Sequence, residues 1–319
     1  MDFIKTLLSN HQVRKTAGQK EAFRQWLLPQ LKKMGYLVYE ESVTGGAVNV
    51  IAGEPAKAKF LLTAHYDTCP KMPVPNFITP FAPIPYFAYQ ALLALGIFVL
   101  CALLSLVIGF VIQQPKLVML LFYLLLAAAL ILLITGPANP HTANDNTSGV
   151  ATLLEIAAAL PPKLRKQTAI IFFDKEERGL AGSRGYKRKH AKELDGQTVI
   201  NFDCVGDGDY LLLMPSKHSR WDGELLDALS EAYQNTDKKQ FCLRTQGNVV
   251  FPSDHRSFKY HVAVAAAKPM KLVGYYIDRI HTAKDTVLDE ENVSVLRDAT
   301  IRFLEIATTD KGEKQNADL

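Results

Sequence analysis

A long stretch almost free of charge, residues 72–144, limits what this chain can fold into more than any other feature. Lys116 is its only residue with a formal charge. Residues 86–112 and 117–134 are runs of about 27 and about 18 mostly apolar residues, and a helix needs roughly 17–25 to cross a bilayer. Water-soluble helices of this length carry a polar face, which these runs lack. The stretch therefore predicts a two-helix transmembrane hairpin over residues 86–135, with a buried core hairpin as the alternative.

A hairpin returns the chain to the side of the membrane that it left. Residues 1–85 and 136–309 are therefore predicted to form a single discontinuous domain in one compartment. These parts carry nearly all the Lys and Arg of the chain, which places the domain in the cytoplasm by the positive-inside rule. The N-terminal residues contain no apolar core of signal-peptide length, which favours the same side. The polar residues 310–319 are predicted to be a disordered tail, and the proline-rich residues 70–85 an extended segment without helix.

Outside the hairpin, short apolar strands alternate with amphipathic helices. Strands are predicted over residues 36–40, 47–52, 59–64, 168–173, 197–202, 210–214 and 261–267. Helices are predicted over residues 2–34 with a break at 12–17, and over residues 149–160, 183–190, 221–233 and 291–308. This alternation is typical of an α/β fold, in which helices cover both faces of a largely parallel sheet. Binding sites of such folds lie at the carboxyl ends of the strands.

Ionisable residues follow three of the predicted strands directly. These residues are His65, the pair Glu176 and Glu177, and Asp203. Because the carboxyl ends of parallel strands share one edge of a sheet, these side chains are expected to lie close together. Each of them alone has an ordinary explanation, such as a solvated acidic turn or a polar surface residue.

Two further residues complete a set of two imidazoles and three carboxylates. The set is His65, Asp145, Glu177, Asp203 and His281. It suits two first-row divalent cations, zinc above all. A carboxylate can bridge two such ions about 3.5–4 Å apart, which polarise a carbonyl and activate a water. Glu176, beside the metals but not bound to them, is the candidate that takes the proton from that water. Taken singly, Asp145 is more typical of a helix cap and His281 of a surface pair.

The charge balance argues against one class of partner. The formal net charge of +4 is small and dispersed, and no stripe of Lys and Arg is interleaved with aromatic residues. Nucleic acid is therefore not a predicted partner. The four cysteines are scattered without a CxxC pair, which fits free thiols in a reducing compartment.

Six motifs in this order resemble peptidase family M28, which comprises zinc aminopeptidases and carboxypeptidases. The motifs are His65-x-Asp67, Asp145-Asn-x-Ser-Gly149, Glu176-Glu177-x-Gly-Leu-x-Gly-Ser183, Asn201-Phe-Asp203, Ser253-Asp254-His255-x-x-Phe258 and His281-Thr-x-x-Asp285-Thr286. The resemblance extends over about residues 17 to 308, apart from the apolar insertion. It implies a mixed eight-stranded sheet between helices, and two co-catalytic zinc ions.

The resemblance also implies a role for each residue of the site. His65 and Asp203 would bind one zinc ion, Glu177 and His281 the other, and Asp145 would bridge them. Glu176 would be the general base and then the acid toward the leaving amine. Asp67 would orient the His65 imidazole. The possible substrate pocket would be formed by Ser253, Asp254, His255 and Phe258.

Two features depart from the family pattern. Many members have a Tyr just before the final His, where it helps to stabilise the oxyanion, and this chain has Ile280 there. Tyr275 or Tyr276 can take that role, so the oxyanion donor stays open. The second departure is the hairpin, which lies between His65 and Asp145 in place of a short loop. That position leads to the hypothesis that the mouth of the active site faces the bilayer surface and favours substrates found there.

The sequence thus predicts an integral membrane protein, anchored in the lipid bilayer through residues 86–135, that acts as a zinc exopeptidase on peptides. Removal of N-terminal residues is favoured over carboxypeptidase action. One alternative is an acyl-transfer enzyme like the one-zinc glutaminyl cyclases, although His65 would then be superfluous. The other is a non-catalytic membrane scaffold, although such proteins typically lack several ligands. An oligomer is compatible with the sequence.

Overall fold

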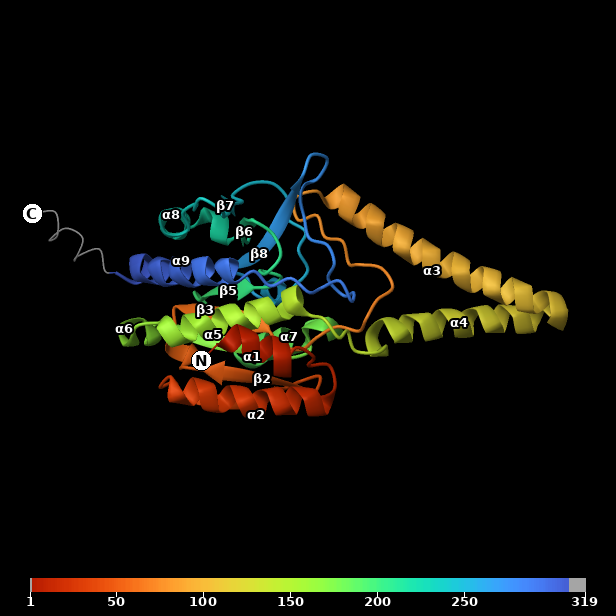
Figure 1. The fold of residues 1–319 in the computed structure, drawn as a ribbon, viewed down its shortest axis with the longest axis horizontal. Helices are drawn as coiled ribbons and strands as arrows, with labels where there is room; N and C mark the ends of the chain where they lie inside the picture. The colour runs from red at the N-terminus through yellow and green to blue at the C-terminus, as the bar shows by residue number, and fades with distance from the viewer. Residues whose placement is uncertain (1, 310–319) are drawn as a thin grey trace, which may run out of the picture.

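A computed structural model describes residues 2–309, and the tail predicted over 310–319 lies outside the described residues. Figure 1 shows an α/β body with two long helices projecting from one end. The helices are α1 (Phe3–Asn10), α2 (Ala17–Lys33), α3 (Pro83–Ile112), α4 (Pro115–Thr135), α5 (Gly149–Ala159), α6 (Pro162–Arg165), α7 (Ala181–Lys189), α8 (Gly223–Ala232) and α9 (Glu290–Thr308). The strands are β1 (Val38–Val43), β2 (Ala47–Ala52), β3 (Phe60–His65), β4 (Thr168–Phe173), β5 (Thr198–Phe202), β6 (Tyr210–Pro215), β7 (Gln240–Leu243), β8 (His261–Met270) and β9 (Gly274–Tyr276).

The strands form one mixed sheet in the order β1-β2-β4-β3-β5-β8-β6-β7, with β9 paired to the end of β8. The central strands β4, β3, β5 and β8 are parallel to one another. The predicted α/β fold with a mixed, largely parallel sheet is confirmed, and β9 adds a ninth strand to the eight expected. β7 was not predicted, because its four residues lie in a polar segment and pair only with β6 in the described chain.

Alternate residues of each central strand fill two cores, as the period of two in a strand requires. On β4, Ile170 and Phe172 pack into the core beneath α5 and α9. Ile171 and Phe173 point the other way, toward Tyr186 of α7. The sheet is thus covered on both faces, and its strand ends are held in fixed register.

The helices α3 and α4 expose an unusual amount of apolar surface. In α3 only Cys101 and Ser105 are buried, and α4 has no buried residue. Phe110 and Val111 near the tip are 84% and 82% exposed, whereas soluble proteins rarely expose large contiguous apolar patches. By length and composition both helices can cross a membrane.

One expectation for the segment before the hairpin is wrong. Residues 70–85 were expected to contain no helix, but α3 begins at Pro83 and includes Pro85. The first turn of a helix has no partner for its amide N–H groups, so proline is tolerated there. α3 therefore starts three residues before the predicted boundary at residue 86.

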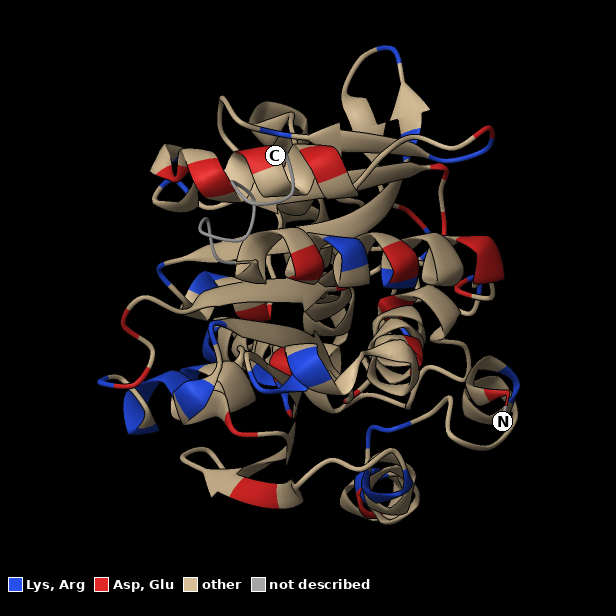
Figure 2. Ribbon diagram, turned by 90° about the vertical axis from the view of Figure 1, so that its left-hand side faces the viewer, with Lys and Arg blue, Asp and Glu red and all other residues tan. Residues whose placement is uncertain are grey.

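The two ends of the hairpin are tied to each other and to one loop of the body. The Lys71 N–H donates to the Pro137 carbonyl at 2.8 Å, and the Met72 N–H donates to the His281 carbonyl at 2.7 Å. Because His281 belongs to the predicted metal set, the hairpin and that set lie at the same end of the sheet (Figure 1). Figure 2 looks onto the opposite end, where acidic and basic residues are both present.

Candidate metal centre

Parallel strands bring three of the predicted ligands to one edge of the sheet. His65 is the last residue of β3, and Asp203 follows β5 directly. Glu176 and Glu177 begin a short 3-10 helix just after β4. Gly179, at φ +81°, ends that turn in the left-handed region that favours glycine. The chain therefore turns back at once, and both glutamates stay at the strand ends.

The five predicted ligands lie together, with Asp145 between the two histidines. His65 Nε2 lies 3.3 Å from Asp145 Oδ1 and 3.5 Å from Asp203 Oδ1. His281 Nε2 lies 3.1 Å from Asp145 Oδ2 and 3.6 Å from Glu177 Oε2. The two carboxylate oxygens of Asp145 therefore face different imidazoles, which is the arrangement expected of a bridging ligand.

Two buried carboxylate oxygens in this cluster, Glu177 Oε1 and Asp203 Oδ1, accept no hydrogen bond from any residue in the described range, although His65 Nε2 lies 3.5 Å from Asp203 Oδ1. Burial of a carboxylate oxygen without a hydrogen-bond donor is costly unless a cation compensates it. His nitrogens and carboxylate oxygens are zinc ligands. The residues therefore fit divalent cations of the zinc type.

The protonation equilibria reflect the same crowding of carboxylates. Burial opposes the charge of Asp145, but hydrogen bonds from His281 and His65 hold the pKa of Asp145 well below its usual range. Burial disfavours the His281 cation, yet Glu177 and Asp145 raise the pKa of His281 to about 9. Burial also raises the pKa of Glu177 to about 8. Without a metal ion, the raised pKa of His281 favours its protonated form, whose positive charge offsets part of the negative charge of the acidic cluster.

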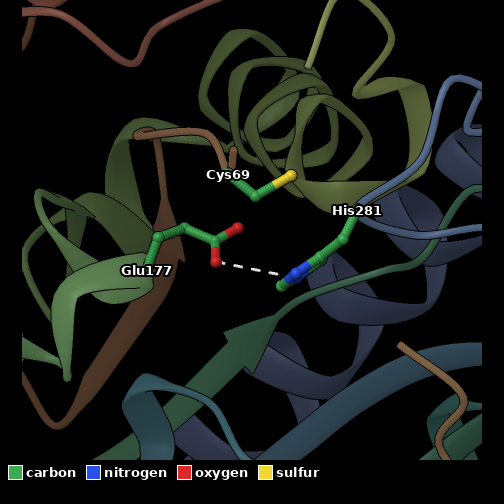
Figure 3. Close-up of side chains that lie close together, drawn as sticks. All are labelled: Cys69, Glu177 and His281. Atoms are coloured by element: carbon green, nitrogen blue, oxygen red, sulfur yellow. Dashed lines mark ion pairs between the residues drawn. The ribbon is translucent and has the colours of Figure 1, made fainter. Parts of the chain in front are cut away.

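Cys69 adds a donor that the sequence did not predict. Its Sγ and ligand atoms of Glu177 and His281 all lie within 4.8 Å of one another. Figure 3 shows the three side chains around one point, with the Glu177–His281 pair dashed. Cys69 is fully buried. Its only signal in the sequence is its position four residues after His65, which alone does not distinguish a ligand from a core thiol.

Glu176 lies beside the ligands but is in neither group of potential metal donors. It lines a cavity of about 550 Å³ together with Asp145, Glu177, Asp203 and His281. Burial raises the pKa of its carboxyl well above the usual value, against the opposing charge of His65 and with support from the charges of Glu177, Asp254 and Asp203. A carboxylate in this position can exchange a proton with a molecule in the cavity.

Asp67 positions the glutamate pair as well as the histidine. Its carboxylate accepts the backbone N–H of Glu176 at 2.9 Å and of Glu177 at 3.3 Å. The nearer partner of His65 Nδ1 is the Asp67 carbonyl oxygen at 3.0 Å, whereas the carboxylate lies at 3.6 Å. Asp67 therefore fixes the imidazole mainly through its backbone, and its side chain fixes the turn after β4.

Asp285 fixes the loop that carries Asp145 in the way that Asp67 fixes the turn after β4. Its carboxylate accepts the backbone N–H of Asn144 at 2.7 Å and of Asp145 at 3.1 Å. Asn146 fixes the other side of this loop, because its side-chain amide donates a hydrogen bond to the Phe202 carbonyl at 3.0 Å. The motif that begins at His281 contains Asp285, but its partner lies 140 residues earlier. The sequence therefore gave no reason to assign it this role.

The four residues predicted for the substrate pocket are buried beside the cavity and do not line it. Ser253 Oγ accepts a hydrogen bond from the Asn201 amide at 2.9 Å, and Phe258 stacks on Phe173. Asp254 and His255 are buried as well. Neighbouring residues of the same loop line the cavity instead, namely Phe251, Pro252 and Arg256.

No tyrosine lines this cavity in the part of the chain that the structure describes. Ile280 is buried among apolar residues. Tyr275 packs against Phe81 and Tyr276 against Phe77, outside the cavity. The polar lining residues that are not acidic or histidine are Asn76, Arg184 and Arg256. Apart from histidine, these are the nitrogen-bearing side chains that line the cavity.

Comparison with known proteins agrees with this fold and identifies a family. The model of peptidase family M28 matches residues 130–304. Among solved structures, the LapA aminopeptidase of Legionella pneumophila aligns with a TM-score of 0.59 and 14% identity, over 97% of this chain and 70% of that one. A glutaminyl cyclase of Porphyromonas gingivalis aligns with a TM-score of 0.56 and 19% identity, over 95% of each chain. A Zn-dependent exopeptidase of Parabacteroides distasonis aligns with a TM-score of 0.54 and 18% identity, over 97% of this chain and 96% of that one. No curated protein sequence matches.

Proposed function

The chain belongs to peptidase family M28, and from this premise we propose that it is a membrane-anchored zinc exopeptidase that removes N-terminal residues from peptides. The observation that carries the proposal is the position of Asp145 between His65 and His281, with Glu177 and Asp203 on either side. Glu176 lines the adjoining cavity without entering the ligand set. A ligand set and a separate proton acceptor are the two parts that metal-assisted hydrolysis of a peptide bond uses.

In this proposal the site would hold two zinc ions. His65 and Asp203 would bind one, Glu177 and His281 the other, and Asp145 would be shared between the two groups. Zinc supplies Lewis-acid polarisation of the carbonyl and a lowered pKa of bound water. Glu176 accepts the proton of the attacking water and returns it to the leaving amine. Asp67 keeps Glu176 and Glu177 in place through their backbone N–H groups.

Removal of metal is expected to abolish peptide hydrolysis. The purified chain should contain two zinc ions, and a strong chelator should remove them together with the activity, because the ligands have no other cation to organise them. Elemental analysis and an assay with unblocked and N-blocked peptides, before and after readdition of zinc, measure both. Fewer than one zinc ion per chain would contradict the two-metal proposal, and cleavage of N-blocked peptides alone would contradict aminopeptidase action.

A glutaminyl-cyclase-like reaction is the second candidate, because one such enzyme shares the fold over 95% of both chains. The two reactions give different products from a peptide with N-terminal Gln. An aminopeptidase releases free glutamine, whereas a cyclase releases ammonia and leaves a pyroglutamyl peptide. The presence of a full five-residue ligand set favours the aminopeptidase.

Membrane anchoring through α3 and α4 is the second part of the proposal. Both helices expose apolar side chains along their length and project from the body. The cytoplasmic side for the catalytic body rests on the charge distribution alone. The segment that leads into α3 contributes Asn76 and Ile78 to the lining of the catalytic cavity. The mouth of the site would therefore lie near the bilayer surface.

Replacement of residues 86–134 by a flexible Gly/Ser linker is expected to release the protein from membranes. The reason is that the exposed apolar surface of the described chain is concentrated in α3 and α4. Sedimentation of the intact and shortened chains, with and without detergent, measures the difference. An intact chain that stays soluble without detergent would show that the hairpin does not enter the bilayer.

A further inference from the structure

A second cavity adjoins the catalytic one. Its volume is about 780 Å³, within the range of roughly 300–1,000 Å³ that is typical of ligand sites. Phe251 and Arg256 line both cavities. The second cavity is bounded by the first turn of α3 and by the loops that follow β6 and precede β8. A molecule bound at the metal centre can therefore continue into it.

The charged side chains that line this cavity are all cationic. They are Lys187, Lys217, Arg220, Arg256 and Lys259, and we call them the cationic groove. No Asp or Glu of residues 2–309 lines it. None of the five forms an ion pair within the described chain, although Asp195 acts on Lys259 electrostatically from outside the groove. By contrast, the nearby Lys189 pairs with Glu41 at 2.8 Å.

The groove is built to keep part of this charge in place. Arg220 Nε donates to the Pro215 carbonyl at 3.1 Å, and Arg220 Nη1 donates to the Gly247 carbonyl at 2.7 Å. These bonds orient the guanidinium without neutralising it, which reduces the entropy that an anionic ligand must overcome. Burial lowers the pKa of His261 in the lining to about 4, against an opposing hydrogen bond to the Phe258 carbonyl and with support from the charges of His218, Arg220 and Arg256. The groove thus carries a positive electrostatic potential, which favours the binding of an anion.

The direction of the groove favours a peptide over a lipid headgroup. The metal centre lies at the carboxyl end of β5, which is parallel to β8. Lys259 and His261 lie at the amino end of β8, and Lys217 follows the antiparallel strand β6 at the same end. The groove therefore reaches from the first turn of α3 toward the amino end of β8. A lipid headgroup at the bilayer surface would meet only its end beside α3, whereas an extended peptide, which advances about 3.3–3.6 Å per residue, can reach the lysines at the other end.

We propose that the cationic groove binds the acidic C-terminal part of a peptide whose N-terminal residue lies at the metal centre. This inference rests on the proposed exopeptidase function and specifies its substrate class. The preferred substrates are short peptides with Glu or Asp after the first residues. Arg256 contacts the part nearest the scissile bond, because it lines both cavities.

The test compares pairs of peptides that differ only in Glu against Gln after the second residue, for several N-terminal residues. With the zinc-loaded full chain in a neutral detergent, kcat/KM should be at least about tenfold higher for the acidic member at low salt. The preference should shrink as salt shortens the Debye length to about 3 Å at 1 M. A labelled acidic peptide should also bind the Glu176→Gln chain, as measured by fluorescence anisotropy.

The double variant Lys187→Gln/Lys217→Gln should lose most of the preference and of the anisotropy signal. Both lysines are exposed and make no hydrogen bond within the described range, so the fold should persist. The matched control is Lys163→Gln/Lys166→Gln, which removes two exposed lysines at and after α6, and it should behave as the unaltered chain.

The outcomes separate this inference from the proposed function. Equal hydrolysis of acidic and amide peptides, unchanged in the lysine variant, overturns the groove and leaves the exopeptidase. Lysine-dependent binding of the labelled peptide without hydrolysis supports the groove and contradicts the exopeptidase. If vesicles of anionic phospholipid bind in a lysine-dependent manner and the acidic peptide does not, the groove is a lipid site and the inference is wrong.

Discussion

Replacement of Glu176 by Gln is expected to lower kcat for peptide hydrolysis by about 10²–10⁴-fold, the usual contribution of a general base, while zinc stays bound. The amide keeps the size of the side chain and cannot accept the proton of the attacking water. Zinc should remain because Glu176 belongs to neither group of potential donors. The backbone N–H of residue 176 would still bond to Asp67, so the turn after β4 should persist.

The neighbouring glutamate provides the matched control. Glu177→Gln makes the same chemical change one residue later, at a side chain that lies 3.6 Å from His281 Nε2. This variant should lose zinc as well as activity. Zinc content and kcat measured side by side on both variants therefore distinguish a proton acceptor from a ligand. If Glu176→Gln hydrolyses peptides at the normal rate, the assignment of the base is wrong, and if it loses zinc, Glu176 is a ligand.

The sequence was sufficient to predict the fold class and the gathering of the five ligands. His65, Glu177 and Asp203 each follow an apolar strand, and parallel strands place their ends together whatever the details of packing. The local pattern also predicted both helices of the hairpin, because an apolar run of that length has few other structures. These features depend on short-range patterns that tertiary contacts reinforce.

Features that depend on contacts between distant segments were not predictable in the same way. The support that Asp285 gives to the Asp145 loop joins residues 140 positions apart. The approach of Cys69 to His281 and the assembly of the cationic groove need the folded loops as well. Ser253, Asp254, His255 and Phe258 were predicted as pocket residues from resemblance. None of them lines the cavity at the candidate metal centre, which Arg256 lines instead, but His255 and Phe258 line the adjoining cavity.

The hairpin is attached at the edge of the sheet that carries the candidate metal centre. The chain leaves the body after β3 and returns before α5, and both connections pair with segments near the metal centre. The hypothesis of an active site near the bilayer requires the candidate metal centre and the hairpin to lie at the same end of the sheet, and they do. The cationic groove begins beside the first turn of α3 and reaches toward the amino end of β8. In the proposed enzyme a peptide would enter beside the membrane and extend its C-terminal part over the body.

Asp145→Ala is expected to have the largest effect of any single substitution on metal binding. Each carboxylate oxygen of Asp145 faces a different histidine, at 3.3 Å from His65 Nε2 and 3.1 Å from His281 Nε2. Removal of this side chain leaves His65 with Asp203 alone and separates them from the group of Glu177, His281 and Cys69, so zinc content should fall below one ion per chain. Hydrolysis should fall by more than the roughly 10–100-fold that is typical when a residue behind the ligands is replaced.

A readout independent of turnover is the stabilisation by zinc. A ligand at 1,000 times its Kd stabilises the folded state by about 4 kcal/mol, so zinc should raise the Tm of the unaltered chain clearly after chelator treatment. The same addition should leave the Tm of the Asp145→Ala chain nearly unchanged, since the bridge between the two donor groups is missing. The control is Asp298→Ala, which removes an exposed carboxylate that pairs with Arg297 on α9, and it should keep the full zinc response. An Asp145→Ala chain that still binds two zinc ions and gains the same Tm would show that the ions are held as independent sites, without a bridging carboxylate.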